Sequence, residues 1–286
     1  MKGLFIKGCK GCGSLLVGLV LLLGLLAGCQ PQRTPQEWFD LTWTGLAGVD
    51  AFHIKGQAEV AALDSSRAQA PQTFAYEAEL NHHTELSVKA VPGQQTLSGV
   101  GTYTAAEPGK PAVLTLQDGS RWVMLQEDKP VTAWTSAAAG RVNPLAIIEG
   151  LREMKKNVRL EHGAARGTLV LRIEPDSEQE LLRLKNELVS EMDRTQALWR
   201  KQMAGQQGNL KAEAVKEGNR LISGSKQQLI KLLSTAKVNT VYHLTISKQS
   251  NLPVRLTSET RITYTSSNGK TRTESLWNDA HFANYR

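Results

Sequence analysis

The chain has 286 residues and a formal net charge of +7, with 34 Lys and Arg residues against 27 Asp and Glu residues. This length is sufficient for one large domain with a substantial core. The basic residues are spread along the sequence without a dense block, which argues against a nucleic-acid-binding protein and against a nucleic-acid partner.

Residues 1–28 have the pattern of a signal peptide. Three lysines precede an apolar run over 15–26, and two small residues then stand before Cys29. The run is shorter than the roughly 20 residues that comfortably span a bilayer. An uncleaved anchor is the alternative interpretation, because the uncharged interval 11–32 could just reach across. Removal of residues 1–28 would lower the net charge from +7 to +4.

The tetrad Leu26-Ala27-Gly28-Cys29 resembles the lipobox of bacterial lipoproteins, in which a diacylglycerol thioether is built on the cysteine before cleavage. The resemblance implies cleavage between Gly28 and Cys29 and a lipid anchor on Cys29. Residues 29–36 would then form a polar, proline-bearing tether. The expected location is the extracytoplasmic face of the cell membrane, or the outer membrane if the cell has one. The mature chain would keep one cysteine and form no internal disulfide.

A single domain is predicted over residues 37–286, opening with a short amphipathic helix over 37–46. From Phe52 onward, apolar and polar residues alternate with a period of two, which indicates a strand with one solvated face. The same alternation predicts roughly eight to ten strands. The clearest of them cover 52–60, 73–81, 84–91, 113–116, 122–125, 168–173, 240–247, 254–264 and 272–277. Asn268-Gly269 predicts a tight hairpin between the last two strands, with positive φ at both residues.

Two helical blocks interrupt the strands. Asn143-Pro144 opens a predicted helix over 145–154, with a capping residue before a first-turn proline. A larger insertion over about 176–237 begins where Ser177 and Glu180 have capping-box spacing. Four glycines in 205–224 predict a loose connection or a weak helix. The fold class that satisfies these patterns is α+β, a curved antiparallel β half-barrel wrapped over inserted α-helices.

Four stretches carry a resemblance to a known superfamily. They are the opening Val49-Asp-Ala-Phe-His-Ile-Lys-Gly, the Asn-Leu-Pro-Val turn within 241–260, the Asn268-Gly269 hairpin, and the ending His281-Phe-Ala-Asn-Tyr. Together they resemble the LolA/LppX-like lipoprotein superfamily. The resemblance implies a half-barrel with a hydrophobic cavity, and a protein that carries or senses an amphiphile near a membrane. The helical insertion departs from the simplest members and could fill or cover the cavity.

Apolar and aromatic side chains at inward positions are the candidate ligand contacts. They could simply form the core between the sheet and the helices, or they could line a cavity for an acyl chain. Composition does not distinguish the two interpretations. The candidate lining residues are Phe52, Ile54, Phe74, Tyr76, Trp122, Trp199, Tyr242 and Tyr264.

No catalytic or cofactor-binding motif stands out in the sequence. His82-His83 with Glu85 is the only histidine cluster, and on a strand adjacent histidines would point to opposite faces, which argues against a metal site. We therefore expect a protein without catalysis, cofactor or metal, which binds a lipid or other hydrophobic ligand. The alternative is an envelope scaffold or regulatory lipoprotein, whose helix-plugged half-barrel docks another envelope protein.

Overall fold

The computed structural model describes residues 33–63, 71–91, 112–117, 121–126, 129–130, 143–204 and 210–286. Residues Pro35–Arg286 form one compact unit, and Met1–Thr34 form a separate one. The predicted signal peptide and Cys29 lie outside the described residues. Within the described ranges, no helix combines the length and apolar character that a membrane span needs.

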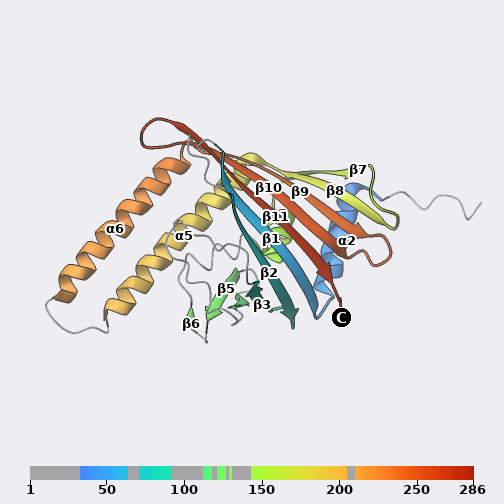
Figure 1. Ribbon diagram of the computed structural model, residues 1–286, viewed down its shortest axis with the longest axis horizontal. Coiled ribbons are helices and arrows are strands. Elements are labelled where there is room, and N and C mark those ends of the chain that lie inside the picture. The colour runs from blue at the N-terminus through green and yellow to red at the C-terminus, as the bar shows by residue number, and fades with distance from the viewer. Residues whose placement is uncertain are drawn as a thin grey trace, which may run out of the picture. The chain divides into compact units, whose positions relative to one another are not determined.

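One open antiparallel sheet of eleven described strands forms the framework of residues 35–286 (Figure 1). The strand order is β6-β5-β4-β3-β2-β1-β11-β10-β9-β8-β7, so two meanders of consecutive strands meet where β1 pairs with β11. The strands of the first meander are β1 Phe52–Ala62, β2 Gln72–Asn81, β3 Glu85–Ala90, β4 Ala112–Gln117, β5 Arg121–Gln126 and β6 Lys129–Pro130. Those of the second are β7 Lys156–Glu161, β8 Thr168–Pro175, β9 Lys237–Ser247, β10 Pro253–Thr265 and β11 Thr271–Ala283.

Four described helices accompany the sheet: α2 Pro35–Ala47, α4 Pro144–Glu153, α5 Ser177–Ala204 and α6 Leu210–Leu233. The face of the sheet that packs against α2 and α4 is here called the inner face, and the opposite one the outer face. Helices α5 and α6 lie side by side as a pair inserted between β8 and β9 (Figure 1). This arrangement confirms the predicted α+β class, a curved antiparallel sheet over inserted helices.

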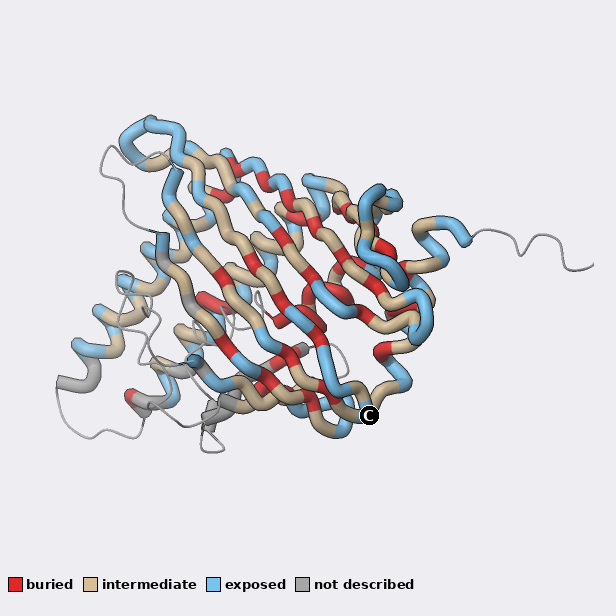
Figure 2. Tube along the Cα trace, turned by 45° about the vertical axis from the view of Figure 1, so that its right-hand side comes forward, coloured by how far each residue is buried: buried red, intermediate tan, exposed pale blue. Residues whose placement is uncertain are grey.

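Alternation along each strand decides which side chains face the helices. In β8 every second residue is buried, and the same alternation continues through β9, where Leu244 and Ile246 are fully buried and Thr245 between them is not. Figure 2 shows the resulting bands of buried and more exposed positions across the sheet. The apolar period of two, read from the sequence, therefore becomes one buried and one solvated face.

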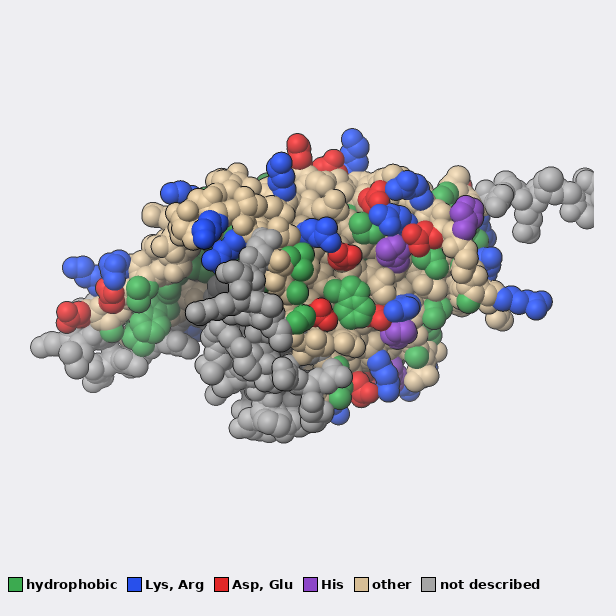
Figure 3. Space-filling view, turned by 45° about the horizontal axis from the view of Figure 1, so that its top comes forward, with side chains coloured by type: hydrophobic (Ala, Val, Ile, Leu, Met, Phe, Trp, Pro, Cys, Tyr) green, Lys and Arg blue, Asp and Glu red, His purple; other side chains and the backbone are tan. Residues whose placement is uncertain are grey.

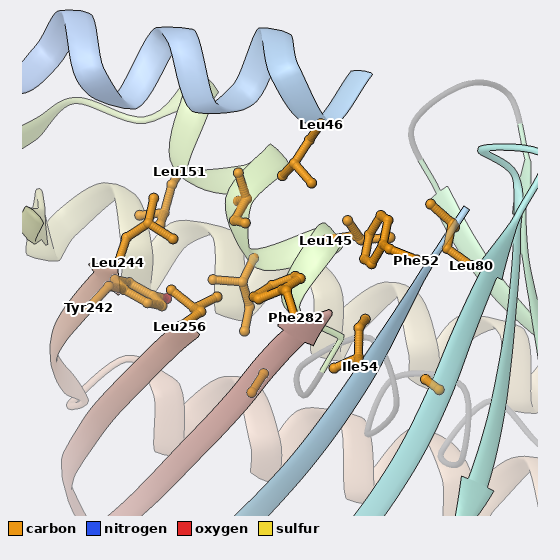
Figure 4. Packing of buried hydrophobic residues seen from close by; sticks show 14 of the residues in the cluster. Leu46, Phe52, Ile54, Leu80, Leu145, Leu151, Tyr242, Leu244, Leu256 and Phe282 are labelled. Carbon is orange, nitrogen blue, oxygen red and sulfur yellow. The ribbon is translucent and has the colours of Figure 1, made fainter. Parts of the chain in front are cut away.

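The core lies between the inner face and the first two helices. Ile148 and Leu151 of α4 and Phe39 of α2 are fully buried, and they pack with inward residues of the sheet such as Phe52 and Leu244. Figure 4 shows Leu46, Leu145 and Leu151 from the two helices directed toward these strands. Burial of such side chains is the main favourable contribution to the folded state, at roughly 1.5–3 kcal/mol each.

Charged pairs across neighbouring strands cover the outer face. Lys55 Nζ lies 3.0 Å from Glu77 Oε1, and Arg255 donates two parallel hydrogen bonds of 2.8 and 2.7 Å to the carboxylate of Asp279. Partial burial alone would raise the pKa of Asp279, but the hydrogen bonds and charge of Arg255 outweigh it and hold that pKa below its usual value. These pairs support strand register more than total stability, because exposed ion pairs contribute little.

Two strands were not predicted from the sequence. The first, β6, has only two residues, which is too short for alternation to be visible. The second, β7, is an edge strand of six residues paired only with β8, and four of its residues are polar or charged. Exposed, polar edge strands protect a sheet from adding foreign strands. Because β7 has few apolar residues, a prediction based on apolar alternation does not detect it.

Of the two alternatives predicted for 205–224, the structure has the helix, because α6 is helical from Leu210 through Gly218 and Gly224, while residues 205–209 lie outside the described ones. The glycine at 218 has a packing role, since a Cβ atom there would overlap the indole of Trp199 on α5. Glycine lowers intrinsic helix propensity by about 1 kcal/mol. At position 218 it also permits the close approach of the two helices, which a propensity argument does not consider.

The predicted cap of α5 is corrected. Asp176, rather than Ser177, accepts hydrogen bonds at its side-chain Oδ1 from the backbone N–H groups of Glu178 and Gln179, at 3.1 and 3.0 Å. Glu180 does not reach back in a capping box and instead bonds Arg183. By contrast, Asn143 caps α4 as predicted, accepting a 3.0 Å hydrogen bond from the N–H of Leu145.

Two turns differ in detail from the prediction. His82 and His83 lie in the turn between β2 and β3, with φ values of 53° and 59°, so they are not on a strand as the sequence argument assumed. The hairpin between β10 and β11 is confirmed, but only Gly269 has positive φ, at 78°. Its loop is closed by a 2.9 Å bond from Ser266 N–H to the Lys270 carbonyl, so it is longer than a two-residue turn.

Candidate ligand-binding face

The inner face changes character beyond the core. Toward the β10–β11 hairpin, hydroxyl and amide side chains occupy inward positions, which we call the polar row: the buried Thr240, Ser258 and Asn278, and the half-buried Thr260. Strand pairing places Ser258 opposite Asn278, and Asn278 opposite Ala58 of β1. Thr240 and Thr260 also lie opposite each other, with their hydroxyl oxygens 3.1 Å apart. Buried polar groups of this kind need hydrogen-bond partners.

Tyr76 marks the boundary between the core and the polar row. Its ring lies over Gly56 of the neighbouring strand, where a Cβ atom would overlap it. Burial raises the pKa of the Tyr76 hydroxyl, the charge of Asp279 raises it further, and a hydrogen bond with Asn278 acts in the opposite direction. The neutral phenol thus connects the aromatic part of the core to the first amide of the polar row.

Helix α5 is attached to the inner face by one charged cluster. The carboxylate of Glu180, which is 4% exposed, accepts hydrogen bonds of 2.7 and 3.2 Å from Arg183, and Glu187 accepts another of 2.8 Å from the same guanidinium. Burial lowers the pKa of Arg183, but these two carboxylates outweigh it and the net shift is upward. For the neutral phenol of Tyr242 on β9, which hydrogen-bonds Glu180, burial acts in the opposite direction and raises the pKa. The start of α5 is therefore fixed to β9.

Apolar side chains beside the polar row keep part of their surface exposed. Val60 of β1 is 37% exposed, and Leu276 of β11 and Ile262 of β10 are half-buried, all at inward positions. None of the three belongs to the cluster packed by α2 and α4. Apolar side chains with a few hydrogen-bonding groups among them are what the site of an amphiphile requires.

A partly buried carboxyl group, that of Glu149, lies beside the core. Trp122 of β5 donates its indole N–H to Glu149 Oε2 of α4 at 3.3 Å. Burial raises the pKa of Glu149, and the bond from Trp122 only partly opposes this. The pair joins α4 to the first meander through a polar contact at the edge of the apolar core.

The eight candidate lining residues do not come together at one place. Five of them, Phe52, Ile54, Tyr76, Trp122 and Tyr242, belong to the buried cluster of the inner face. Trp199 is separate, because it contacts Gly218 between the two inserted helices. Tyr264 lies near the far end of β10, where its hydroxyl donates to Glu274 at 2.5 Å. The side chain of Phe74 lies outside the described ones, as do Gly28 and Cys29.

Histidines pair with single carboxylates on the surface. His53 lies 3.5 Å from Glu79, His243 lies 3.2 Å from Glu161, and the outer-face histidine His281 lies 3.4 Å from Asp279. His83 of the histidine cluster noted in the sequence lies 2.6 Å from Asp50 instead of joining Glu85. Within the described part of the chain, no group of three His, Cys, Asp or Glu side chains could hold a metal ion.

The polar row was not recognised from the sequence, although a signal is present. Thr240, Ser258 and Asn278 occupy positions of the alternating pattern that point inward, where an apolar residue is expected. A polar residue at an inward position departs from the pattern that specifies a core, and such departures are expected at functional sites. The cluster of Glu180, Arg183 and Glu187 had no such signal, because its spacing is that of an ordinary helix surface.

Comparison with known proteins gives likeness in structure only. No protein-family model matches the chain, and no curated protein sequence does. Among solved structures, a LolA superfamily protein from Nitrosomonas europaea matches at 11% identity, over 88% of this chain and 95% of that one, with a TM-score of 0.27. A structure describing lipid–protein interactions in lipovitellin matches at 7% identity with a TM-score of 0.41. That match covers 82% of this chain, which spans 25% of the lipovitellin chain.

The first of these structures carries the name of the superfamily that the sequence resembles. Because both TM-scores are below 0.5, neither likeness carries an argument about the site. The fold assignment rests on the strand order and on the helices that pack against the inner face.

Proposed function

We propose that this chain is an extracytoplasmic lipoprotein, anchored to the membrane through Cys29, whose inner face binds an amphiphile without catalysing a reaction. The main supporting observation is that half-exposed Val60, Ile262 and Leu276 lie next to the polar row. An acyl chain would cover the apolar side chains, and the polar end of the molecule would meet hydroxyl and amide groups.

The filled part of the inner face limits the size of this site. Fully buried Ile148 and Leu151 of α4 already pack against the inward side chains of the core. A bound acyl chain would therefore lie toward the β10–β11 hairpin, next to α5, rather than in the centre of the sheet. This placement follows from the packing of α4, since cores at native density leave no room for a further chain.

Native mass spectrometry of residues 34–286, purified from a bacterial host, tests the proposal. We expect a co-purifying lipid, and uptake of a fluorescent acyl probe after delipidation. Leu276→Gln should weaken probe uptake several-fold, because it places an amide on the apolar surface of the site. The matched control Ser275→Gln changes the adjacent outer-face position and should leave uptake unchanged. Absence of both lipid and probe uptake would refute the carrier function.

A second function is favoured by exposed leucines on the inserted helices. Leu182 of α5 and Leu221 of α6 are 57% and 56% exposed, although each lies in a regular helix. Under this alternative the helix pair docks another envelope protein, and the chain acts as a scaffold. Loss of a co-purifying protein on Leu182→Ser and Leu221→Ser, with unchanged uptake of the acyl probe, would support the scaffold over the carrier.

A further inference from the structure

We propose that one end of the sheet, formed by the β7–β8 and β9–β10 turns, docks onto anionic phospholipid headgroups. This inference rests on the proposed anchoring beside a bilayer, and it adds which surface of the domain faces that bilayer. We call this surface the basic end and define it by His162 and Arg166 of the first turn and Lys248 of the second.

The two turns form one continuous surface. The backbone N–H of Lys248 donates a 3.0 Å hydrogen bond to the carbonyl of Gly167, which joins the β9–β10 turn to the β7–β8 turn. His162, Arg166 and Lys248 are all exposed. Gly163 and Gly167 have positive φ, at 88° and 83°, so the first turn is built to reverse the chain tightly and present its side chains outward.

The charges within the two turns have one sign. Neither stretch, 162–168 or 247–253, contains an acidic residue. The nearest one in sequence, Glu161, is directed to the outer face, where it lies 3.2 Å from His243 and 3.9 Å from Arg172. Figure 3 shows Lys, Arg and His side chains, and no Asp or Glu, at the right-hand tip of the visible face. Basic side chains in such a setting attract an anionic surface.

Helix α2 carries two exposed acidic residues, Glu37 in its first turn and Asp40 one turn later. Burial lowers the pKa of Lys156 at the start of β7, and the negative charge of Asp40 raises it. Asp40 therefore acts on β7. Gln36 donates a 2.9 Å hydrogen bond to the same carboxylate. Asp40 is therefore engaged along the side of α2 rather than at the two turns.

The tether brings this end of the domain to the bilayer. The domain begins at Pro35 in α2, whose start lies toward the β7–β8 turn (Figure 1). Later in the same helix, a Cβ atom at Gly45 would lie 3.1 Å from Leu252 of the β9–β10 turn, so α2 runs beside the basic end. The chain from Cys29 to Pro35 extends at most about 20 Å. The far β10–β11 hairpin lies at the other end of the strands (Figure 1).

The expected strength follows from the two permanent cations. Each Lys or Arg near an anionic membrane surface favours binding by about fivefold. Arg166 and Lys248 together should favour the docked orientation by about 25-fold, and salt should weaken it because the side chains are exposed. That is enough to orient a domain already held at the surface, but not enough to hold it there alone.

Site-specific fluorescence quenching tests this orientation. Residues 30–286 contain no cysteine, so Gln249→Cys provides a single labelling position in the β9–β10 turn, and Ser267→Cys provides one in the β10–β11 hairpin. An N-terminal hexahistidine segment in place of Cys29 tethers the protein to vesicles that carry a nickel-chelating lipid. The vesicles consist of phosphatidylcholine with a nitroxide on the headgroup, with or without phosphatidylglycerol.

We expect stronger quenching at position 249 than at 267 on phosphatidylglycerol vesicles, with the difference lost at high salt. Arg166→Gln with Lys248→Gln should shift the docking equilibrium by about 25-fold and remove the difference. The matched control, Lys270→Gln with Arg272→Gln, removes equal charge from the far hairpin and should leave it intact. Equal quenching at both positions, or equal effects of both double variants, overturns the proposal. Because nickel replaces the lipid anchor, neither a failure of acylation at Cys29 nor an empty inner face affects the result.

Discussion

Trp199 and Gly218 form the contact that decides how closely α5 and α6 approach. The indole lies where the Cβ atom of any other residue at 218 would be, whereas a Cβ atom at Gly224 would meet nothing within 4 Å. The surrounding contacts between the helices are polar, such as the 3.2 Å bond from Gln196 to Asn219. The helix pair therefore depends on one glycine for its tight contact.

Gly218→Ala should destabilise the helix pair by about 1–3 kcal/mol, because the methyl group forces the indole away. Gly224→Ala is the matched control and should stabilise by about 1 kcal/mol, through helix propensity alone. Urea denaturation followed by circular dichroism at the helical band measures both. A stabilising effect of alanine at both positions would show that the Trp199 contact does not constrain the pair.

At the scale of elements, Asp176 couples the end of β8 to the start of α5. Its side chain caps two N–H groups of the helix, and its own N–H donates a 2.8 Å bond to the carbonyl of Lys155 before β7. Carboxylates at a helix N-terminus also interact favourably with the helix dipole. One residue thus ends a strand, begins a helix and contacts the edge of the sheet.

Asp176→Ala should lower the free energy of unfolding by about 1 kcal/mol, the usual cost of losing such a cap. Ser177→Ala should change it little, since Ser177 is exposed and follows the cap. Thermal unfolding of the two variants in parallel separates these roles. If Ser177→Ala lowered the free energy of unfolding more than Asp176→Ala, Ser177 would be the cap, as the sequence pattern indicated.

The sequence predicts those elements that are determined by residues close together in the chain, and not those determined by contacts between distant residues. The strand faces and α4 were predicted, because alternation and an Asn-Pro start act within a few residues. The close contact at Gly218 of α6 and the position of His82 and His83 in a turn were not, because a distant tryptophan and the pairing of β2 with β3 decide them. The polar row was missed for a similar reason. Its residues are scattered over three strands, and only pairing brings them together.

For the whole molecule, attachment through Cys29 is the prediction with the widest consequence. The leader predicts that cysteine as the first mature residue, with a lipid on its sulfur. Cys29→Ala should abolish incorporation of radiolabelled lipid in a bacterial host, whereas Cys12→Ala, within the leader, should leave it unchanged. Equal labelling of both variants would disprove lipidation at Cys29.

The pairing of β1 with β11 joins two strands that are separated in sequence by nearly the whole chain. His53 pairs with Ala283, and Ala62 pairs with Glu274, at the centre of the sheet. Each meander can begin to form from consecutive strands, but the central strands cannot join until the last segment has been made available. Pairings of such large sequence separation are slow to form. A chain emerging from N- to C-terminus would thus expose the inner side of β1 until its final residues arrive, so a product truncated before β11 should remain open to proteases.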